Sequence, residues 1–225
     1  MMHLEQNIKG LCAKHGIHYN DFMADLEVDE VHELTLFDLQ AIAEEYQIDL
    51  MALLFKPVYH SEPLTKKLKK IACLIVDVDG VMTDGGMYWS EQGDQSKKFN
   101  TKDGLGLLEL TKKDFKVGII SSGFTQVIVQ KRAELLGITH CYVGQQPKLE
   151  VLASWCKEWG IALENVAVIG DDKNDIALLN AVGLAACPAD AINEVKSICP
   201  IVLEKKGGEG CVREFIDAYL QPYLK

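Results

Sequence analysis

Acidic, hydroxyl and basic side chains stand directly after short apolar segments of this 225-residue chain. They are Asp77 and Asp79, Ser121 and Ser122, and Asp171 and Asp172, with Lys148 between the last two pairs. Carboxylates without histidine suit a hard divalent cation, and oxygen ligands favour Mg2+, which often also binds a substrate phosphate. A serine beside Gly123, together with Lys148, could hold phosphate oxygens through a hydroxyl, a backbone N–H group and a positive charge.

Two aspartates that stand two residues apart can also perform bond chemistry. Asp77 could attack phosphorus and form an aspartyl-phosphate. Asp79 would lie on the same side of an extended strand end, where it could act as general acid and then as general base. Each motif alone has an ordinary explanation, because DxDG often forms a turn, GDD often forms a loop and a lone lysine is usually solvated. Their combination in this order favours a phosphoryl-transfer site.

The apolar segments before these residues are typical of β-strands buried on both faces, because they are short, continuous and partly β-branched. We expect strands at 71–76, 117–120 and 166–169, and weaker strands at 139–143, 184–186 and 201–203. Amphipathic stretches of helical length lie between them at 125–136 and 149–159. This alternation predicts an α/β fold, a Rossmann-like parallel sheet with helices on both faces. Such sheets bind ligands at the carboxyl ends of their strands, where the polar residues stand.

The first 60 residues differ from the rest in charge and pattern. They hold three basic and eleven acidic side chains, whereas the whole chain carries a net charge of −10. Apolar residues recur at helical spacing, which predicts a small all-α N-terminal domain over 1–60. Pro63 and a lysine cluster predict an exposed linker over 61–70, and the α/β domain then spans 71–225.

Residues 4–55 resemble the phage-repressor type of helix-turn-helix domain, mainly in its closing helices. A recognition helix needs basic or amide side chains toward phosphates and bases, but residues 25–33, where that helix should lie, carry five carboxylates. We therefore expect no nucleic-acid partner, and favour a protein partner or a structural role for residues 1–60. A DNA-binding regulator that senses a sugar phosphate is the alternative to an enzyme.

The chain also lacks signals for membranes and export. No apolar run approaches the length of a membrane span, and the amino terminus has no basic region followed by an apolar stretch. Seven scattered cysteines form no CxxC pair. These features predict a cytoplasmic protein with reduced thiols and no membrane contact.

Four groups of residues resemble the motifs of the haloacid dehalogenase superfamily of phosphatases. They are residues 77–85, Ser122-Gly123, Lys148 and residues 170–175. Segments 83–88, 98–104 and 207–215 are similar to the capless branch, which contains phosphatases of 3-deoxy-D-manno-octulosonate 8-phosphate and of nine-carbon keto-acid 9-phosphates. The resemblance covers residues 71–220. It implies magnesium-dependent hydrolysis of a phosphorylated 3-deoxy-2-keto sugar acid through an aspartyl-phosphate.

The resemblance implies roles for individual residues. Asp77 is the nucleophile, and Asp79 is the general acid and base. The phosphate would be held by Ser122 (or by Ser121 as the alternative), Gly123 and Lys148. Magnesium would bind the Asp77 carboxylate, the Asp79 backbone carbonyl and Asp171, with Asp172, Asn174 and Asp175 supporting from nearby. The residues expected to contact the substrate are Asn100, Thr101, Lys102, Asp103, Gly104 and Arg132.

The resemblance leaves the length of the sugar open. Two arginines typical of the octulosonate enzymes are replaced here by Leu108 and Phe124. Segments 97–101 and 205–210 look closer to the nine-carbon branch. The resemblance also implies a homotetramer, in which a hairpin at about 84–99 forms the subunit contact and the glycine-rich tail at 207–210 reaches a neighbour's site.

Overall fold

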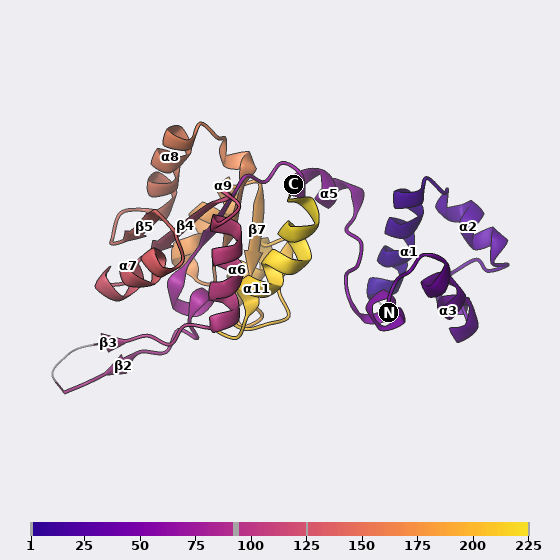
Figure 1. The fold of residues 1–225 in the computed structure, drawn as a ribbon, viewed down its shortest axis with the longest axis horizontal. Helices are drawn as coiled ribbons and strands as arrows, with labels where there is room; N and C mark the ends of the chain where they lie inside the picture. Colours follow the sequence, from indigo (N-terminus) through magenta and orange to yellow (C-terminus); the bar gives the residue numbers. More distant parts are fainter. Residues whose placement is uncertain (1, 92–94, 125, 225) are drawn as a thin grey trace. The chain divides into compact units, whose positions relative to one another are not determined.

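The computed structural model describes residues 2–91, 95–124 and 126–224. The chain divides into two units, Met1–Lys66 and Lys67–Lys225 (Figure 1). Each unit has an apolar core built from its own residues, one within 4–59 and one within 73–199. The division falls inside the predicted linker, 61–70.

The first unit is helical, as its sequence pattern predicts. Its helices are α1 (Met2–His15), α2 (Tyr19–Asp25), α3 (Leu36–Glu45) and α4 (Leu50–Phe55). Helix α3 begins at a capping box, in which the Asp38 N–H group donates to Thr35 and the Thr35 N–H group donates to the Asp38 carboxylate. Buried Asn7 closes the unit, because its amide nitrogen donates to the carbonyls of Leu53 and Lys56 at 2.8 and 2.6 Å.

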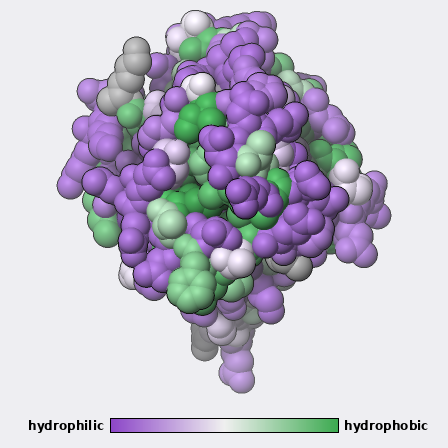
Figure 2. Space-filling model, turned by 90° about the vertical axis from the view of Figure 1, so that its right-hand side faces the viewer, coloured by the Kyte–Doolittle hydropathy of each residue, from purple (hydrophilic) through white to green (hydrophobic). Residues whose placement is uncertain are grey.

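The resemblance of this unit to a helix-turn-helix domain is not supported. Where a recognition helix was expected, between α2 and α3, the only helical element is the single turn Val31–Glu33. The acidic residues of 25–33 therefore lie at the end of α2, in the connection that follows it and in this single turn, and the DNA-binding alternative loses its structural basis. The face shown in Figure 2 is mainly hydrophilic with scattered apolar side chains. Those exposed in this unit are Leu36, Phe37, Met51 and Phe55.

The predicted linker contains a helix, α5 (Glu62–Leu68), which the sequence reasoning missed. Proline is tolerated in a first helical turn because its missing N–H group would have no partner there. Lys66 pairs with Glu62 one turn earlier at 2.6 Å, and Leu68 is buried. The lysine cluster thus forms the exposed face of a short helix.

The second unit contains six strands in one sheet with every neighbouring pair parallel. They are β1 (Cys73–Val76), β4 (Lys116–Ser121), β5 (His140–Val143), β6 (Val166–Ile169), β7 (Leu184–Cys187) and β8 (Ile201–Val202), in the order β5-β4-β1-β6-β7-β8. All residues of β1 and β6 are buried, so the sheet is covered on both faces. The predicted parallel α/β fold is confirmed.

The helices of this unit are α6 (Thr101–Thr111), α7 (Gln126–Leu135), α8 (Lys148–Trp159), α9 (Ile176–Ala181), α10 (Asn193–Ile198) and α11 (Cys211–Phe215). Helices α8, α9 and α10 share a core with alternate strand residues such as Cys73 and Ile75. Helices α6 and α11 pack against each other (Figure 1). After α11 the chain continues as a wider helical turn, Ile216–Leu220.

A two-stranded antiparallel hairpin, β2 (Tyr88–Trp89) and β3 (Gln95–Ser96), lies where a hairpin was predicted. Residues 92–94 of that prediction fall outside the described residues. Met87, Tyr88 and Trp89 are exposed. None of the helices within 2–91, 95–124 and 126–224 combines the length and apolar character that crossing a bilayer needs.

Because each unit has its own core, we expect two separate unfolding transitions in a thermal scan. A chain lacking residues 1–60 should keep one transition, with its unfolding free energy changed by less than about 0.5 kcal/mol. Leu11 and Leu152 are both fully buried, each in a different unit. Leu11→Ala should lower the free energy of unfolding of the first unit only, whose transition the deletion removes. Leu152→Ala should lower that of the second unit only, and each loss should be roughly 2–5 kcal/mol. A single transition lowered by both variants would contradict independent units.

Candidate active site

The carboxyl ends of β1, β4 and β6 lie side by side, since β1 pairs with both of the others. Asp77 follows β1, Ser121 ends β4, and Asp171 follows β6 after one glycine. One carboxylate oxygen each of Asp77, Asp171 and Asp175 lie within 4.8 Å of one another. The topology thus brings side chains nearly 100 positions apart in the sequence to one point.

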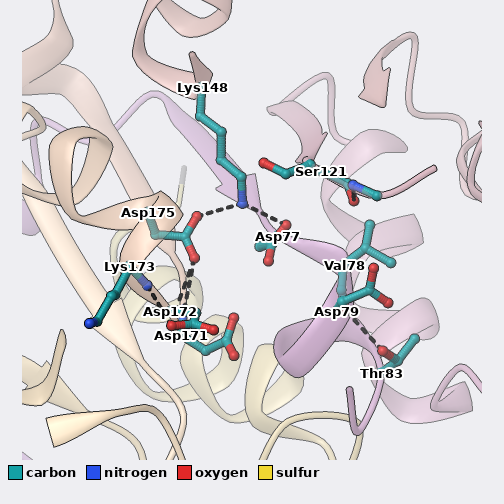
Figure 3. A network of polar contacts seen from close by, with 12 residues as sticks. Asp77, Val78, Asp79, Thr83, Ser121, Lys148, Asp171, Asp172, Lys173 and Asp175 are labelled. Carbon is teal, nitrogen blue, oxygen red and sulfur yellow. Dashed lines mark hydrogen bonds and ion pairs between the residues drawn. The ribbon is translucent and has the colours of Figure 1, made fainter. Parts of the chain in front are cut away.

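Lys148 and Asp175 hold this cluster together (Figure 3). Lys148 is the first residue of α8, and its Nζ atom lies 2.6 Å from Asp175 Oδ1 and 2.8 Å from Asp77 Oδ1. The other Asp175 oxygen accepts the backbone N–H groups of Asp171 and Asp172 at 3.0 and 3.4 Å. Asp175 therefore fixes the loop after β6 and joins it to the lysine.

The electrostatics of the cluster favour added positive charge. Burial raises the pKa of Asp77 above its usual range. Burial, and then the charges of Asp77 and Asp175, raise the pKa of Asp171 to about 8. Burial alone would lower the pKa of Lys148, but the two carboxylates beside it outweigh that effect and raise it. The single charge of Lys148 does not balance three carboxylates, of which Asp77 and Asp175 are buried and Asp171 is half-buried.

The cluster fits a divalent cation held by oxygen. Asp171 Oδ1 is buried and has no hydrogen-bond partner among the described residues, so it is available to an ion. The spacing of the three carboxylates is one that a single ion with oxygen ligands can bridge. The cluster contains Asp175 in place of Asp79. Asp79 was expected to bind the metal through its backbone carbonyl, and this expectation stays a prediction.

The loop after β1 passes close to Asp171. Gly80 has a φ of +88°, and a Cβ atom built on it would lie 2.0 Å from Asp171 Oδ2. Only glycine combines that backbone conformation with that approach. The loop thereby keeps Asp79 near the cluster without displacing Asp171.

Ser121 and Gly123 form the opposite side of the site. Ser121 is buried, and its Oγ atom accepts the Gly123 N–H group at 3.1 Å. Figure 3 shows the Ser121 side chain beside the Asp77–Lys148 pair. The backbone carbonyl of Ser122 accepts Gln145 Nε2 at 2.9 Å, on a more exposed part of the loop. The geometry thus favours Ser121, the alternative, over the predicted Ser122.

Comparison with known proteins decides the family. Residues 35–216 match a model of haloacid dehalogenase-like hydrolases. The chain is 38% identical over 170 residues to the 3-deoxy-D-manno-octulosonate 8-phosphate phosphatase of Escherichia coli K12, covering 76% of this chain and 89% of that one. This chain belongs to the haloacid dehalogenase-like hydrolase family.

Solved structures of such hydrolases agree with this assignment. The phosphatase of the same name from Yersinia pestis matches with a TM-score of 0.70 and 37% identity, over 73% of this chain and 89% of that chain. The Moraxella catarrhalis protein, solved with a magnesium ion, a phosphate ion and the sugar acid, matches with a TM-score of 0.68 and 31% identity, over 73% and 95%. Hydrolases of this family use a divalent metal, in keeping with the three-aspartate cluster.

The predicted substrate residues of this hydrolase do not all face outward. Thr101 and Lys102 are exposed at the start of α6. Asp103 is buried, and its Oδ1 atom accepts the Arg213 N–H group at 2.7 Å, so it ties α6 to α11. Gly104 is also buried. Direct substrate contact by Asp103 and Gly104 therefore does not fit the structure, because helix packing covers them.

Arg132 and Asn100 are linked to each other and to the glycine segment. The Arg132 guanidinium lies 5.4 Å from the centre of the Phe99 ring, and its Nη2 atom donates to the Asn100 carbonyl at 3.3 Å. The Asn100 amide donates to the Gly208 carbonyl at 3.1 Å. Arg132 is half-buried, so part of its charge remains accessible.

The glycine-rich segment 207–210 contacts its own chain, and the expectation that it reaches a neighbour's site stays a prediction. The Gly208 N–H group donates to the Val81 carbonyl at 2.9 Å. A Cβ atom on Gly207 would lie 2.0 Å from the Gly80 carbonyl oxygen. Gly207 and Gly208 lack side chains where the segment packs directly on the loop that carries Asp79.

Two residues of the loop after β6 are peripheral. Asp172 and Asn174 are exposed, and the Asp172 carboxylate accepts the Lys173 N–H group at 2.7 Å. They shape the loop, whereas Asp175 enters the cluster.

The sequence analysis did not identify one residue of the site. Lys97 forms an ion pair with Asp79, although the sequence offered only a lysine pair before Phe99.

The raised pKa of Asp171 predicts a pH-dependent stability of the metal-free protein. At neutral pH the native Asp171 holds a proton that the unfolded chain has released. The free energy of unfolding should therefore fall as the pH rises from about 4 to about 8. In EDTA at pH 8, Asp171→Asn should melt higher than the wild type, by about 3 °C or more.

Thermal scans from pH 5 to 8 check this expectation. Adding Mg2+ should raise the Tm of the wild type and leave the Tm of Asp171→Asn nearly unchanged. Asp172→Asn removes an exposed neighbouring carboxylate and should keep the pH slope of the wild type. If the Tm of wild type and of Asp171→Asn changed equally with pH, burial of the Asp171 carboxylate would not be the cause of the pH dependence.

Proposed function

We propose that this protein is a magnesium-dependent phosphatase of a phosphorylated 3-deoxy-2-keto sugar acid, namely 3-deoxy-D-manno-octulosonate 8-phosphate or a close relative. The observation that carries the proposal is the cluster of Asp77, Asp171 and Asp175, in which Lys148 contacts Asp77 and Asp175, with Ser121 and Asp79 nearby. The named relatives act on this substrate and span most of the second unit.

In the proposed reaction, a carboxylate oxygen of Asp77 forms a bond to phosphorus while the bond from phosphorus to the sugar oxygen breaks. Asp79 gives its proton to that leaving oxygen. Asp79 then takes a proton from a water molecule, whose oxygen attacks the phosphorus of the aspartyl-phosphate. Inorganic phosphate leaves and Asp77 is restored.

The site must bind an anion among carboxylates, so positive charge and N–H donors are essential. Lys148, the Ser121 hydroxyl and the backbone at Gly123 would contact the phosphoryl oxygens, with Ser121 in place of Ser122, the serine expected from the sequence. Mg2+ would be held by Asp77 and Asp171, with Asp175 and the Asp79 carbonyl near it. Bound there, it supplies charge that offsets the repulsion between phosphate and carboxylates.

The eight-carbon substrate leads because the named relatives act on it. The nine-carbon alternative rests on segments 97–101 and 205–210, which look closer to that branch. Phe124, which is 92% exposed, stands where the octulosonate enzymes typically carry an arginine, and this loss weakens the eight-carbon assignment. Arg132 is then the main cation left for the substrate carboxylate. Asn100, Thr101 and Lys102 flank it.

The assembly and setting of the enzyme are also proposals. We infer a cytoplasmic homotetramer in which the β2–β3 hairpin lies at a subunit contact, supported by its exposed Met87, Tyr88 and Trp89. The domain boundaries 1–60, 61–70 and 71–225 are supported by the two separate cores. Residues 1–60 would bind a protein partner, supported by their exposed Leu36, Phe37, Met51 and Phe55.

Asp77→Asn should abolish phosphate release, by about 10^3-fold or more, because an amide cannot form the aspartyl-phosphate. The measurement is Mg2+-dependent phosphate release, with circular dichroism to show that the variant folds. Asp114→Asn, an exposed acid before β4, should retain wild-type turnover. Full turnover by Asp77→Asn would refute the assigned nucleophile.

A substrate comparison decides the sugar. We expect kcat/KM to be at least about tenfold higher for 3-deoxy-D-manno-octulosonate 8-phosphate than for a nine-carbon 9-phosphate at equal concentration. The reverse order would assign the nine-carbon branch. Failure of both, with other phosphates also inert, would overturn the phosphatase proposal itself.

A further inference from the structure

Lys97 is a buried cation near the site to which the proposed reaction assigns no role. It follows β3 at the base of the hairpin, and only 2% of its side chain is exposed. Its Nζ atom pairs with Oδ1 of Asp79. A lysine is rarely buried unless it is paired, because removing its charge from water is costly.

The two carboxylate oxygens of Asp79 have different surroundings. Oδ1 is taken by Lys97. Oδ2 faces the Ser121–Gly123 corner, since a Cβ atom on Gly123 would lie 3.2 Å from both Asp79 Oδ2 and Ser121 Oγ. Asp79 keeps 36% of its side chain exposed. The oxygen that faces the phosphate side of the site is therefore Oδ2.

We propose that Lys97 is a positioning residue that holds Asp79 Oδ1 and thereby directs Oδ2, the oxygen that carries the proton, at the leaving group. This inference rests on the proposed phosphatase function. In the first step the proton on Oδ2 moves to the bridging sugar oxygen as its bond to phosphorus breaks. Asp79 is left as a carboxylate whose Oδ1 remains paired with Lys97.

The two buried lysines of the site then divide the carboxylates between them. Lys148 is bound to Asp77 and Asp175, whereas Lys97 is bound to Asp79 alone. Lys97 directly follows β3, so the hairpin positions the cation that contacts Asp79. The adjacent Lys98 is different, since its side chain is 66% exposed and its Nζ atom lies 3.6 Å from Asp84. An exposed pair of that kind contributes little.

The adjacent lysines give a matched pair of variants, Lys97→Met and Lys98→Met, which keep the length of the side chain and remove its charge. Single-turnover experiments with excess Mg2+-loaded enzyme would follow release of the leaving group. Two probes are used. The first is the alkyl phosphate 3-deoxy-D-manno-octulosonate 8-phosphate, and the second is the aryl phosphate p-nitrophenyl phosphate. The aryl probe leaves as a stable phenolate and needs little protonation.

If Lys97 directs the proton, Lys97→Met should slow release from the sugar phosphate by about 10-fold to 100-fold. Release from p-nitrophenyl phosphate should fall by less than about threefold, and KM should change little. Lys98→Met should match the wild type on both probes. Circular dichroism and Tm would show that both variants fold.

Three results would overturn the inference. They are equal rates for Lys97→Met and Lys98→Met, equal losses on both probes for Lys97→Met, and a raised KM with unchanged kcat, which would make Lys97 a substrate contact. Wild-type turnover with loss in Asp77→Asn establishes the phosphatase independently. Failure of the Lys97 inference is thus distinguishable from failure of the proposed function. If the wild type is inert on all phosphates, both proposals fall.

Discussion

The structure of the site depends on one electrostatic constraint, the confinement of several carboxylates in a buried space. Asp77, Asp171 and Asp175 lie within ion-binding reach of one another, with Lys148 as the cation that contacts two of them. Like charges in a poorly solvated space raise each other's pKa, as at Asp171. A divalent cation bound there would offset the excess negative charge. The same repulsion that destabilises the metal-free site thus favours binding of a divalent cation.

The backbone around the cluster is shaped to keep these charges close. The loop after β1 approaches Asp171 at Gly80, and the 207–210 segment packs on that loop at Gly207. Both approaches exclude a side chain. Asp175 adds two hydrogen bonds from the backbone of the loop after β6. Main-chain contacts thus fix the loops that carry Asp79 and Asp171, while Lys148 and Lys97 bind the carboxylates through their side chains.

The sequence predicted much of the fold but less of the contacts. Strand β6 has the predicted bounds, and β1 and β4 differ from prediction by one or two residues at their ends. The helix α5 was missed because Pro63 and four lysines suggest a linker, whereas proline is compatible with a first turn and Leu68 is buried. The recognition helix expected near 25–33 is absent from that described segment, because helical spacing alone does not identify a helix-turn-helix domain.

The sequence by itself determined the parallel α/β pattern and the placement of Asp77, Ser121 and Asp171 at one sheet edge. Apolar periodicity is local, and parallel strands end at a common edge. Only the tertiary structure decided that Ser121 faces the site instead of Ser122, that Asp175 joins the cluster, and that Lys97 reaches Asp79. The last two contacts join residues 27 and 18 positions apart. Contacts between side chains this far apart in the sequence depend on how the whole fold packs. Such packing produces no periodic pattern of residues from which the contacts could be predicted.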